Sequence, residues 1–395
     1  MIIPFVVLLT VGILLALPVI VLVTQITAAC CSVRRKLVVS VPRPSMAVVI
    51  PAHDEERTIG NTVLSIAPQM ASEDRLVVVA DNCSDDTAVV ARRVGAEVTE
   101  RFDDACRGKG YALAHGLRHL EDSTCPDVVV FVDADCRAMP GCIDCLARAA
   151  MQLNCPVQAA YVMEPPRSGK TAALVSFAWK VKDFVRPLGW HHLNLPCQLA
   201  GSGMAFPRSV INLVDLASDH LAEDIKLGID LAMLGKFPRF CPDAVVTSKV
   251  FTGAGPSKSQ RTRWEHGALH LLTTYPPRLV VRWLQLPSLS LAAVTLDITV
   301  PPLALLALAL GIYTTLATLF AATTGLLAPL IAALCLSALF VSAIFLAWLG
   351  HGRDLLPLSA LLMAPLYALS KLPLYLKFVV ARQRRWVRGE RELPG

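Results

Sequence analysis

The stretch DVVVFVDAD, Asp127–Asp135, decides the fold class of this chain. It is a short run of β-branched and aromatic apolar residues that ends in two aspartates. Three similar runs precede it, at Met46–Pro51, Arg75–Asp81 and Ala96–Arg101, and segments with helical spacing follow the first, second and fourth runs. Short apolar runs that alternate with helical segments predict βαβ units around a parallel sheet. The sequence therefore predicts an α/β domain.

Acidic residues stand where three of these runs end. Asp54 and Glu55 follow the first run, Asp81 closes the second, and Asp133 and Asp135 close the fourth. In an open α/β sheet, ligands bind at the carboxyl ends of the strands. Two carboxylates that emerge from a buried strand are costly to place without a function, and hard oxygen ligands suit Mg²⁺ or Mn²⁺. We therefore expect a metal site at Asp133 and Asp135 instead of a solvated surface turn.

The N-terminal segment is a predicted membrane anchor. Residues 1–33 carry no charged side chain, and Arg34, Arg35 and Lys36 follow at once. A secretory signal peptide would place its positive charges before the apolar stretch. Positive charges after the stretch indicate a membrane helix whose C-terminal end faces the cytoplasm. We expect Pro18 to kink this helix without ending it.

The C-terminal third is predicted to return to the membrane. Between Asp297 and Arg353 the sequence has 55 residues without Asp, Glu, Lys or Arg, enough for two spans with a break near Ala322–Gly325. A further apolar stretch, Leu355–Val380, precedes a basic tail. The positive-inside rule places that tail in the cytoplasm, which favours a re-entrant or interfacial helix over a third C-terminal span. We expect an anchor at 1–33, a cytoplasmic catalytic domain at 46–280, a membrane region at 287–380 and a basic cytoplasmic tail at 381–395.

Composition excludes several other classes of protein. Hydrophobic residues make up 54% of the chain and charged residues 17%, with a mean hydropathy of +0.53. Charged residues are about 25% of an average soluble protein, so part of this chain belongs in lipid. The net charge is +6, but the basic residues flank apolar segments, which argues against nucleic-acid binding. The twelve cysteines fit reduced cytoplasmic thiols, and Cys142 and Cys145 have no second pair for a zinc site.

Three further motifs offer groups for phosphate and sugar chemistry. GKG at Gly108–Gly110 would let Lys109 and the backbone approach a phosphate. Glu223 and Asp224 begin a helical segment, where acidic residues also occur for the helix dipole alone. In QRTRW, Gln260–Trp264, Arg263 suits phosphate oxygens and Trp264 offers an aromatic face, although a basic cluster at a lipid surface would look similar.

Taken in order, the motifs resemble those of family 2 inverting glycosyltransferases. They are PAHDE (51–55), ADNCSDDT (80–87), GKGYAL (108–113), DAD (133–135), AGSGMAF (200–206), AEDIKLG (222–228) and QRTRW (260–264). The nearest group is the membrane subgroup with cellulose synthase, hyaluronan synthase and ceramide glucosyltransferase. The resemblance covers roughly residues 46–270. It implies a Rossmann-like GT-A fold with transmembrane helices beside it.

The resemblance also implies roles for individual residues. Asp54, Glu55 and Asp81 match positions that contact the nucleotide, Asp133 and Asp135 those that hold donor and Mg²⁺ or Mn²⁺, and Asp224 the catalytic base. The remaining matched positions are expected to bind substrate: Lys109, Gly201, Ser202, Gly203, Glu223, Gln260, Arg263 and Trp264. The sequence departs from the family at Asp54, where asparagine is usual. The extra negative charge leaves the contact made by that position open.

The implied function is transfer of a sugar from a nucleotide-diphosphate sugar, by family resemblance a UDP-sugar, to a lipid-linked or glycan acceptor. The enzyme would sit in a bacterial inner membrane or its equivalent and act in glycolipid or exopolysaccharide assembly. A processive polysaccharide synthase is the alternative within transferases. A transporter with a nucleotide-binding domain is the alternative from another class, but it would predict ionisable groups inside the spans. Between Ile298 and Gly352 the sequence has only His351.

Overall fold

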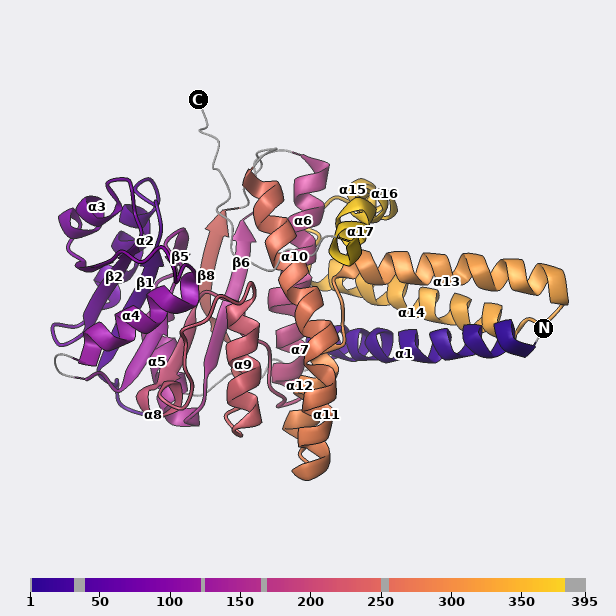
Figure 1. Cartoon of the computed structure of the whole chain (residues 1–395), viewed down its shortest axis with the longest axis horizontal. Coiled ribbons are helices and arrows are strands. Elements are labelled where there is room, and N and C mark those ends of the chain that lie inside the picture. The colour runs from indigo at the N-terminus through magenta and orange to yellow at the C-terminus, as the bar shows by residue number, and fades with distance from the viewer. Residues whose placement is uncertain (1, 32–39, 122–124, 165–168, 250–255, 381–395) are drawn as a thin grey trace.

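The computed structural model describes residues 2–31, 40–121, 125–164, 169–249 and 256–380; for 256–263 and 379 it describes the backbone alone. The predicted tail at 381–395 and the basic residues Arg34–Lys36 lie outside the described residues. Figure 1 shows an α/β domain at one end, a long helical bundle at the other, and a layer of helices between them.

Within the described ranges, eight strands form one mixed sheet in the order β3-β2-β1-β4-β7-β6-β8-β5. The strands are β1 (Met46–Ala52), β2 (Arg75–Asp81), β3 (Glu97–Arg101), β4 (Val128–Phe131), β5 (Cys136–Ala138), β6 (Val157–Glu164), β7 (Met204–Pro207) and β8 (Arg239–Lys249). The four runs of the sequence are β1 to β4, as predicted.

The first four strands are all parallel to one another. β1 lies between β2 and β4, with Ile50 opposite Val78 and Val48 opposite Val130, and β2 pairs with β3. The carboxyl ends of β1, β2 and β4 therefore meet at one edge of the sheet. β7 runs antiparallel to both β4 and β6. This reversal brings the turn that precedes β7 to the same edge.

Helices cover both faces of the sheet because the strands are apolar on both sides. Along β1, Val48 and Ile50 pack against α2 (Ile59–Ile66) and α5 (Cys142–Leu153), while Ala47 and Val49 pack against α4 (Lys109–Glu121). The remaining elements of this domain are η1 (Ala67–Gln69), α3 (Thr87–Arg93), α8 (Arg208–Ile211) and α9 (Glu223–Met233). A three-layer α/β sandwich results, as expected for near-continuous apolar strands.

Three long helices extend away from the sheet as a bundle (Figure 1). They are α1 (Ile2–Cys31), which continues through Pro18, α13 (Leu303–Thr324) and α14 (Ala328–His351). α13 ends at Gly325, which has a φ of 76°, inside the break expected from the sequence. The N-terminus and the turn between α13 and α14 lie together at the far end. In length and composition, these helices and Leu358–Phe378 are four segments of the described chain that could cross a membrane.

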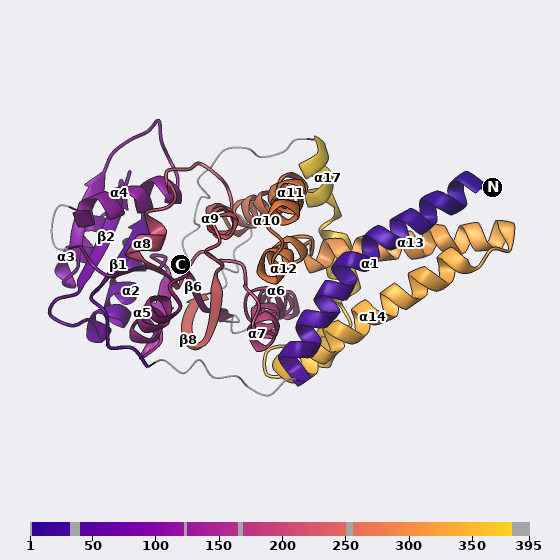
Figure 2. The same cartoon turned by 90° about the horizontal axis from the view of Figure 1, so that it is seen from below.

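Shorter helices join the bundle to the sheet domain (Figures 1 and 2). They are α6 (Lys170–Lys180), the π-helical turn η2 (Val181–Val185), α7 (Arg186–His192), α10 (Pro256–Thr274), α11 (Pro276–Gln285) and α12 (Leu289–Ile298). The apolar stretch after α14 is broken into α15 (Leu358–Leu361), α16 (Ala364–Ser370) and α17 (Leu372–Val380). These three pieces lie at the base of the bundle instead of running along α13 and α14.

A buried polar network fixes the anchor helix to the junction. Arg186 on α7 donates from Nη2 to Asp297 Oδ1 on α12 at 2.7 Å and from Nε to Gln25 Oε1 on α1 at 2.8 Å. All three side chains are almost fully buried. A buried ion pair is stable only when its remaining donors and acceptors are satisfied, and Gln25 provides that third partner. The network therefore sets how α1 sits on the rest of the molecule.

Candidate active site

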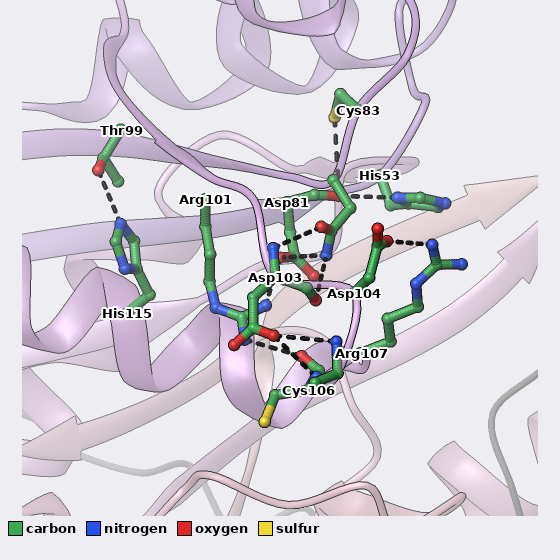
Figure 3. A network of polar contacts seen from close by, with 12 residues as sticks. His53, Asp81, Cys83, Thr99, Arg101, Asp103, Asp104, Cys106, Arg107 and His115 are labelled. Carbon is green, nitrogen blue, oxygen red and sulfur yellow. Dashed lines mark hydrogen bonds and ion pairs between the residues drawn. The ribbon is translucent and has the colours of Figure 1, made fainter.

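The end of β2 carries a buried ion pair. Asp81 is 6% exposed, and Arg101 at the end of β3 donates from Nη1 to Asp81 Oδ1 at 2.7 Å. Arg101 also reaches Asp103 Oδ2 at 2.9 Å and the carbonyl of Cys106 at 2.7 Å, so it ties the loop before α4 to the sheet edge (Figure 3). Asp81 is held in one orientation at the edge where ligands bind.

The loop after β1 folds back onto this pair. The His53 ring and the Asp81 carbonyl share a hydrogen bond of 2.7 Å (Figure 3). Asp54 has a φ of 52° and accepts a hydrogen bond from the backbone of Ser84 at 2.6 Å. Left-handed backbone favours Asn and Asp among residues with side chains, which explains why Asp can replace the usual asparagine here. Glu55 donates from its backbone to Thr87 Oγ1 at 2.7 Å.

Lys109 is the centre of the site. Its ammonium lies 2.5 Å from Asp133 Oδ1 and 3.7 Å from Glu223 Oε1, and it donates to the carbonyl of Gly201 at 2.6 Å. A methyl group on Gly201 would lie 3.2 Å from Asp224 Oδ2 and 3.8 Å from Asp133 Oδ2. Three carboxylates and one ammonium, from the loop after β4, from α9 and from α4, therefore surround the Gly201 turn.

Glycines allow this close approach. Gly201 has a φ of 84°, in the left-handed region that side chains rarely adopt. At Gly110, a Cβ would collide with the carbonyl of Leu216 and would lie 2.8 Å from that of Ser218. The start of α4 can lie against the loop before α9 only without a side chain at this position. The GKG motif thus serves packing, and that packing brings Lys109 to the acidic residues.

The charged groups of the cluster change one another's pKa values. Burial alone would lower the pKa of the Lys109 ammonium, but the carboxylates of Asp133 and Glu223 raise it above its ordinary value. Burial, with the adjacent charge of Asp224, raises the pKa of Glu223 to about 7, although Lys109 opposes the shift. Lys109 is thus firmly protonated, whereas Glu223 is poised to gain or lose a proton near neutral pH.

The two aspartates of the DAD motif can share a divalent cation. Oxygen atoms of Asp133 and Asp135 and the sulfur of Cys136 lie within 4.8 Å of one another. Burial raises the pKa of the Cys136 thiol well above its ordinary value, so the thiol stays protonated and is a poor ligand. The donor set is therefore two carboxylates, which suits Mg²⁺ or Mn²⁺. Lys109 competes for one of them.

An aromatic pair forms another wall of the site. Trp264 of α10 meets Trp179 of α6 edge to face, with ring centroids 5.0 Å apart, and Lys182 lies 4.6 Å from the Trp179 ring centroid. Lys182 belongs to the π-helical turn η2, which widens the helix between α6 and α7. Such turns occur often at functional sites. Here the turn places Lys182 on the cavity wall.

All of these walls enclose one cavity of about 1460 Å³. At one end it is lined by Asp54, Glu55 and Asp81, and in the middle by the Lys109 cluster. It then continues along α13, α14 and α16, where the lining is mainly apolar and includes Leu308, Ile312, Leu316, Phe340, Val341 and Ile344, with Thr315 and Ser337 among them. A single space therefore joins the polar sheet edge to an apolar groove on these helices, in which Ile312, Leu316 and Val341 are more than half exposed.

The structure brings most of the predicted site residues onto this cavity. Those on its wall are Asp54, Glu55, Asp81, Lys109, Asp133, Asp135, Gly201, Glu223, Asp224 and Trp264. Ser202 and Gly203, expected to bind substrate, lie behind the wall. Ser202 is fully buried and its Oγ accepts from the backbone of Asp133 at 3.0 Å, while a Cβ at Gly203 would lie 2.7 Å from Ala159 Cβ. The side chains of Gln260 and Arg263 lie outside the described residues.

Sequence reasoning missed several residues of the site. Arg101 is a charged residue at the end of a strand, a common position for arginine, so the sequence did not mark it. Gln158 lies inside an apolar strand. It donates to the Ser202 carbonyl at 2.8 Å and accepts from the Ala200 backbone at 2.8 Å. A polar residue in such a strand was the available signal. His220, Trp179 and Lys182 also line the cavity. No pattern in the sequence connects them to the acidic motifs.

A family-level sequence model agrees with this geometry. The model for "Glycosyltransferase like family 2" matches residues 42–267, more than half of the chain. The chain belongs to the family 2-like glycosyltransferases. The matched range covers β1 to β8 and the start of α10, and so contains every predicted site residue of this glycosyltransferase.

Similar proteins support the family and the fold. Two 4,4'-diaponeurosporenoate glycosyltransferases of Staphylococcus aureus strains are 40% and 38% identical over 91 residues, which is 23% of this glycosyltransferase and 24% of each relative. The chain thus spans about a quarter of these curated relatives. A mannosyltransferase from Pyrobaculum calidifontis, solved with GDP-mannose and Mn²⁺, matches with a TM-score of 0.56 at 19% identity, covering 95% of this chain and 100% of that one. That likeness shows the GT-A fold.

Proposed function

We propose that this enzyme transfers a sugar from a nucleotide-diphosphate sugar to a long-chain lipid acceptor at the membrane surface. The observation that carries the proposal is the cavity that runs from the acidic cluster into the apolar space between α13, α14 and α16. A polar donor fits one end, and a hydrocarbon chain fits the other. The acceptor named for the Staphylococcus aureus relatives, a diaponeurosporenoate, is also lipid-like.

The geometry supports direct inversion with Asp224 as the base. Asp224 would take the proton from the acceptor hydroxyl, and that oxygen would attack the anomeric carbon on the face opposite the diphosphate. Lys109 would neutralise negative charge on the donor while holding Asp133 and the Gly201 carbonyl in place. An α-linked donor would then give a β-linked product. We take uridine as the base of the donor from the family resemblance.

We assign the cofactor site to Asp133 and Asp135. A Mg²⁺ or Mn²⁺ ion bound there would offset the negative charge of the diphosphate leaving group. The Pyrobaculum calidifontis neighbour was solved with Mn²⁺. Excess EDTA should abolish transfer, and Asp135→Ala should reduce it on the order of 10²-fold or more, as for loss of one charged transition-state contact. Full transfer by Asp135→Ala in EDTA would contradict the assignment.

Orientation and span number follow from charge and shape. We place residues 46–280 in the cytoplasm, with α1, α13 and α14 crossing the membrane and α15 to α17 lying at its surface. The breaks between α15, α16 and α17, and their position at the base of the bundle (Figure 1), support three spans over four. The tail at 381–395 would then face the cytoplasm, as the positive-inside rule requires.

A processive synthase fits the cavity less well. A growing polysaccharide needs a polar exit, because each hydroxyl that enters an apolar space without a hydrogen-bond partner is costly. The membrane half of this cavity is lined mainly by Leu, Ile, Val and Phe side chains, and the hydroxyls of Thr315 and Ser337 there are already hydrogen-bonded to Gly311 and Thr314. We therefore favour transfer to a lipid over polymer export.

The test combines a donor screen with a blocked cavity. Purified full-length enzyme in nanodiscs would be incubated with radiolabelled nucleotide sugars and with 1-dodecanol or 1-butanol as acceptor. A Cβ on Gly311 meets nothing within 4 Å and Gly311 lines the cavity, so Gly311→Trp should fill the apolar half. We expect Gly311→Trp to lose transfer to dodecanol and to keep transfer to butanol. Leu319→Trp is the control, since Leu319 is on α13, 60% exposed. Equal loss with both acceptors, or no transfer by the wild type, would contradict the proposal.

A further inference from the structure

A second polar group lies on the wall of the same cavity, one residue beyond Trp264. Glu265 on α10 forms an ion pair with Lys371, at the junction of α16 and α17, and Tyr375 follows one turn later. All three side chains line the cavity. No motif of the sequence pointed to them, and the mechanism proposed above does not use them.

Two atoms of this group are buried without a partner. Tyr375 is 7% exposed, and its hydroxyl lies beside the Glu265 carboxylate. Burial, together with this carboxylate, raises the pKa of the phenol, but the hydroxyl has no partner at hydrogen-bonding geometry in the described structure. Glu265 Oε2 is also buried and unpaired, although Oε1 meets Lys371. Buried polar atoms without partners destabilise a fold, so a native protein that keeps them invites an explanation in terms of a ligand.

Helix geometry points these groups the same way. Tyr375 donates from its backbone to the Lys371 carbonyl at 3.2 Å, and residues four apart lie on one helix face. Tyr367 lies four residues before Lys371, and its ring centroid is 5.5 Å from the Lys371 ammonium. The neighbours of this stripe on the cavity wall are apolar, among them Leu362, Pro365 and Leu369. These polar side chains are therefore surrounded by apolar residues on the cavity wall.

We propose that Glu265, Lys371 and Tyr375 form an acceptor subsite for an uncharged, hydroxyl-bearing head group, such as a sugar or another polyol on a lipid. This inference rests on the proposed function. A hydroxyl both donates and accepts, which matches a carboxylate oxygen that accepts, an ammonium that donates and a phenol that does both. The aromatic rings of Tyr367 and Trp264 suit a sugar face.

The charges disfavour an anionic head group. Glu265 and Lys371 neutralise one another, so the subsite offers no net positive charge to a phosphate or a carboxylate. The unpaired oxygen belongs to the carboxylate and would repel an anion. The enzyme would therefore select acceptors that carry several hydroxyl groups over simple alcohols and over fatty acids of the same chain length. In this it would differ from the Staphylococcus aureus relatives, whose named acceptor is a carboxylate.

A purely structural role makes a different prediction. The same helices are already joined by a contact of 3.4 Å between His266 Nε2 and the Leu374 carbonyl, and the ion pair adds a second link. If the group served only to hold α17 on α10, the Tyr375 hydroxyl beside Glu265 would affect stability alone. Removing it would then change the unfolding temperature, with no effect on acceptor choice.

The experiment compares three acceptors of one chain length: dodecyl β-D-glucoside, 1-dodecanol and dodecanoic acid. Full-length enzyme in nanodiscs would be assayed with the donor found in the screen above. We expect the wild type to have the lowest KM for the glucoside. Tyr375→Phe should raise that KM roughly 3- to 10-fold, as for one neutral hydrogen bond, and Glu265→Gln on the order of 10-fold. The KM for dodecanol should not change.

The matched control is Tyr313→Phe. Tyr313 is buried on α13 away from the cavity, and its hydroxyl donates to the Pro329 carbonyl at 3.3 Å. The Tyr313→Phe variant should be less stable than the wild type and should show the same acceptor preference. Thermal unfolding and donor binding would confirm that each variant folds. Equal use of glucoside and dodecanol by the wild type, a preference for dodecanoic acid, or an unchanged glucoside KM in Tyr375→Phe would overturn this inference alone. Failure of all three acceptors, with donor still bound, would overturn the proposed function and this inference with it.

Discussion

At the scale of single residues, Asp224 and Glu223 are adjacent carboxylates with different expected roles. Neighbouring residues on a helix point about 100° apart, so one alone can face the reacting oxygen. Asp224→Asn keeps the shape and removes the basicity. We expect transfer to fall on the order of 10²–10⁴-fold while nucleotide binding survives. Glu223→Gln should be milder. Near-normal transfer by Asp224→Asn, measured alongside nucleotide binding, would move the base to Glu223 or to another element.

Glu223 also makes the stability of the enzyme depend on pH. Burial, aided by Asp224, raises its pKa in the folded state to about 7 from an ordinary value of 4.5. The folded state then binds this proton more tightly than the unfolded state, so the contribution of Glu223 to stability is greatest below pH 4.5 and falls as the pH rises towards 7. The loss is on the order of 1–3 kcal/mol. We expect Glu223→Gln to unfold at a higher temperature than the wild type at pH 8, with little difference at pH 4.5. An equal difference at both pH values would show that the carboxyl does not titrate in this range.

The acidic residues of the site could be predicted because each stands directly after a strand or at a helix start, where local sequence fixes position. The meeting of these residues at one site could not be predicted from the sequence. Lys109 meets Asp133 and Glu223 only because Gly110 lets α4 touch the loop before α9 and because β7 reverses beside β4. The burial of Ser202 depends on the same tertiary contacts, and a turn motif read in sequence gives no sign of which side faces the cavity.

At the scale of elements, the crossing of α1 and α7 depends on Gly189. A Cβ there would collide with the Gln25 carbonyl and would lie 2.9 Å from Gln25 Cα. Because these are backbone atoms, Gly189→Ala must push the helices apart, and overpacking of this kind typically costs about 1–3 kcal/mol. We expect a clear fall in the unfolding temperature. Gly60→Ala on α2 is the control: its new methyl would lie 3.5 Å from Val90 Cγ1, so it should be neutral or stabilising. Equal unfolding temperatures for the two variants would show that the helices can adjust.

The elements that were predicted are those with a strong local pattern. β1 to β4 are apolar runs bounded by polar residues, and α1, α13 and α14 are long uncharged segments, so period and length alone identify them. The antiparallel placement of β7, the π-helical turn η2 and the division of the last apolar stretch into α15, α16 and α17 escaped prediction. Each of these depends on neighbours far away in the chain, such as the packing of η2 against α1 and α14.

At the scale of the whole molecule, the fold divides the chain into a polar end and an apolar end with the cavity joining them. The sequence indicated both ends separately, through charge and hydropathy. It could not show that one space runs through both, because the cavity wall combines residues from the sheet edge, α9 and α13, which are separate segments of the sequence. The sequence left a lipid-linked and a glycan acceptor open, and the continuous cavity is what favours the lipid.

The orientation of the enzyme in the membrane can be tested by labelling cysteines on each side. The N-terminus and the turn between α13 and α14 lie at the end of the bundle far from the sheet (Figure 1). If the sheet domain is cytoplasmic, that turn must be outside. Cys125 is exposed on the sheet domain, whereas Cys241 is fully buried and would not react with a labelling reagent. A membrane-impermeant maleimide should label Cys125 in inverted vesicles and leave it unlabelled in intact cells.

Two introduced cysteines complete the test, in a background in which all native cysteines are replaced by serine or alanine, because Cys31 and Cys335 are exposed as well as Cys125. Leu326→Cys, in the exposed turn after α13, should be labelled from outside intact cells. A cysteine appended after Gly395 should be labelled only in inverted vesicles if α15 to α17 stay at the surface. Labelling of that cysteine from outside would mean that Leu358–Phe378 crosses as a fourth span, against the charge of the tail. The subsite at Lys371 and Tyr375 would then have to form inside the bilayer, where an unpaired hydroxyl is costlier still. Labelling of Cys125 from outside would reverse the whole enzyme and place its nucleotide-sugar site away from the cytoplasm.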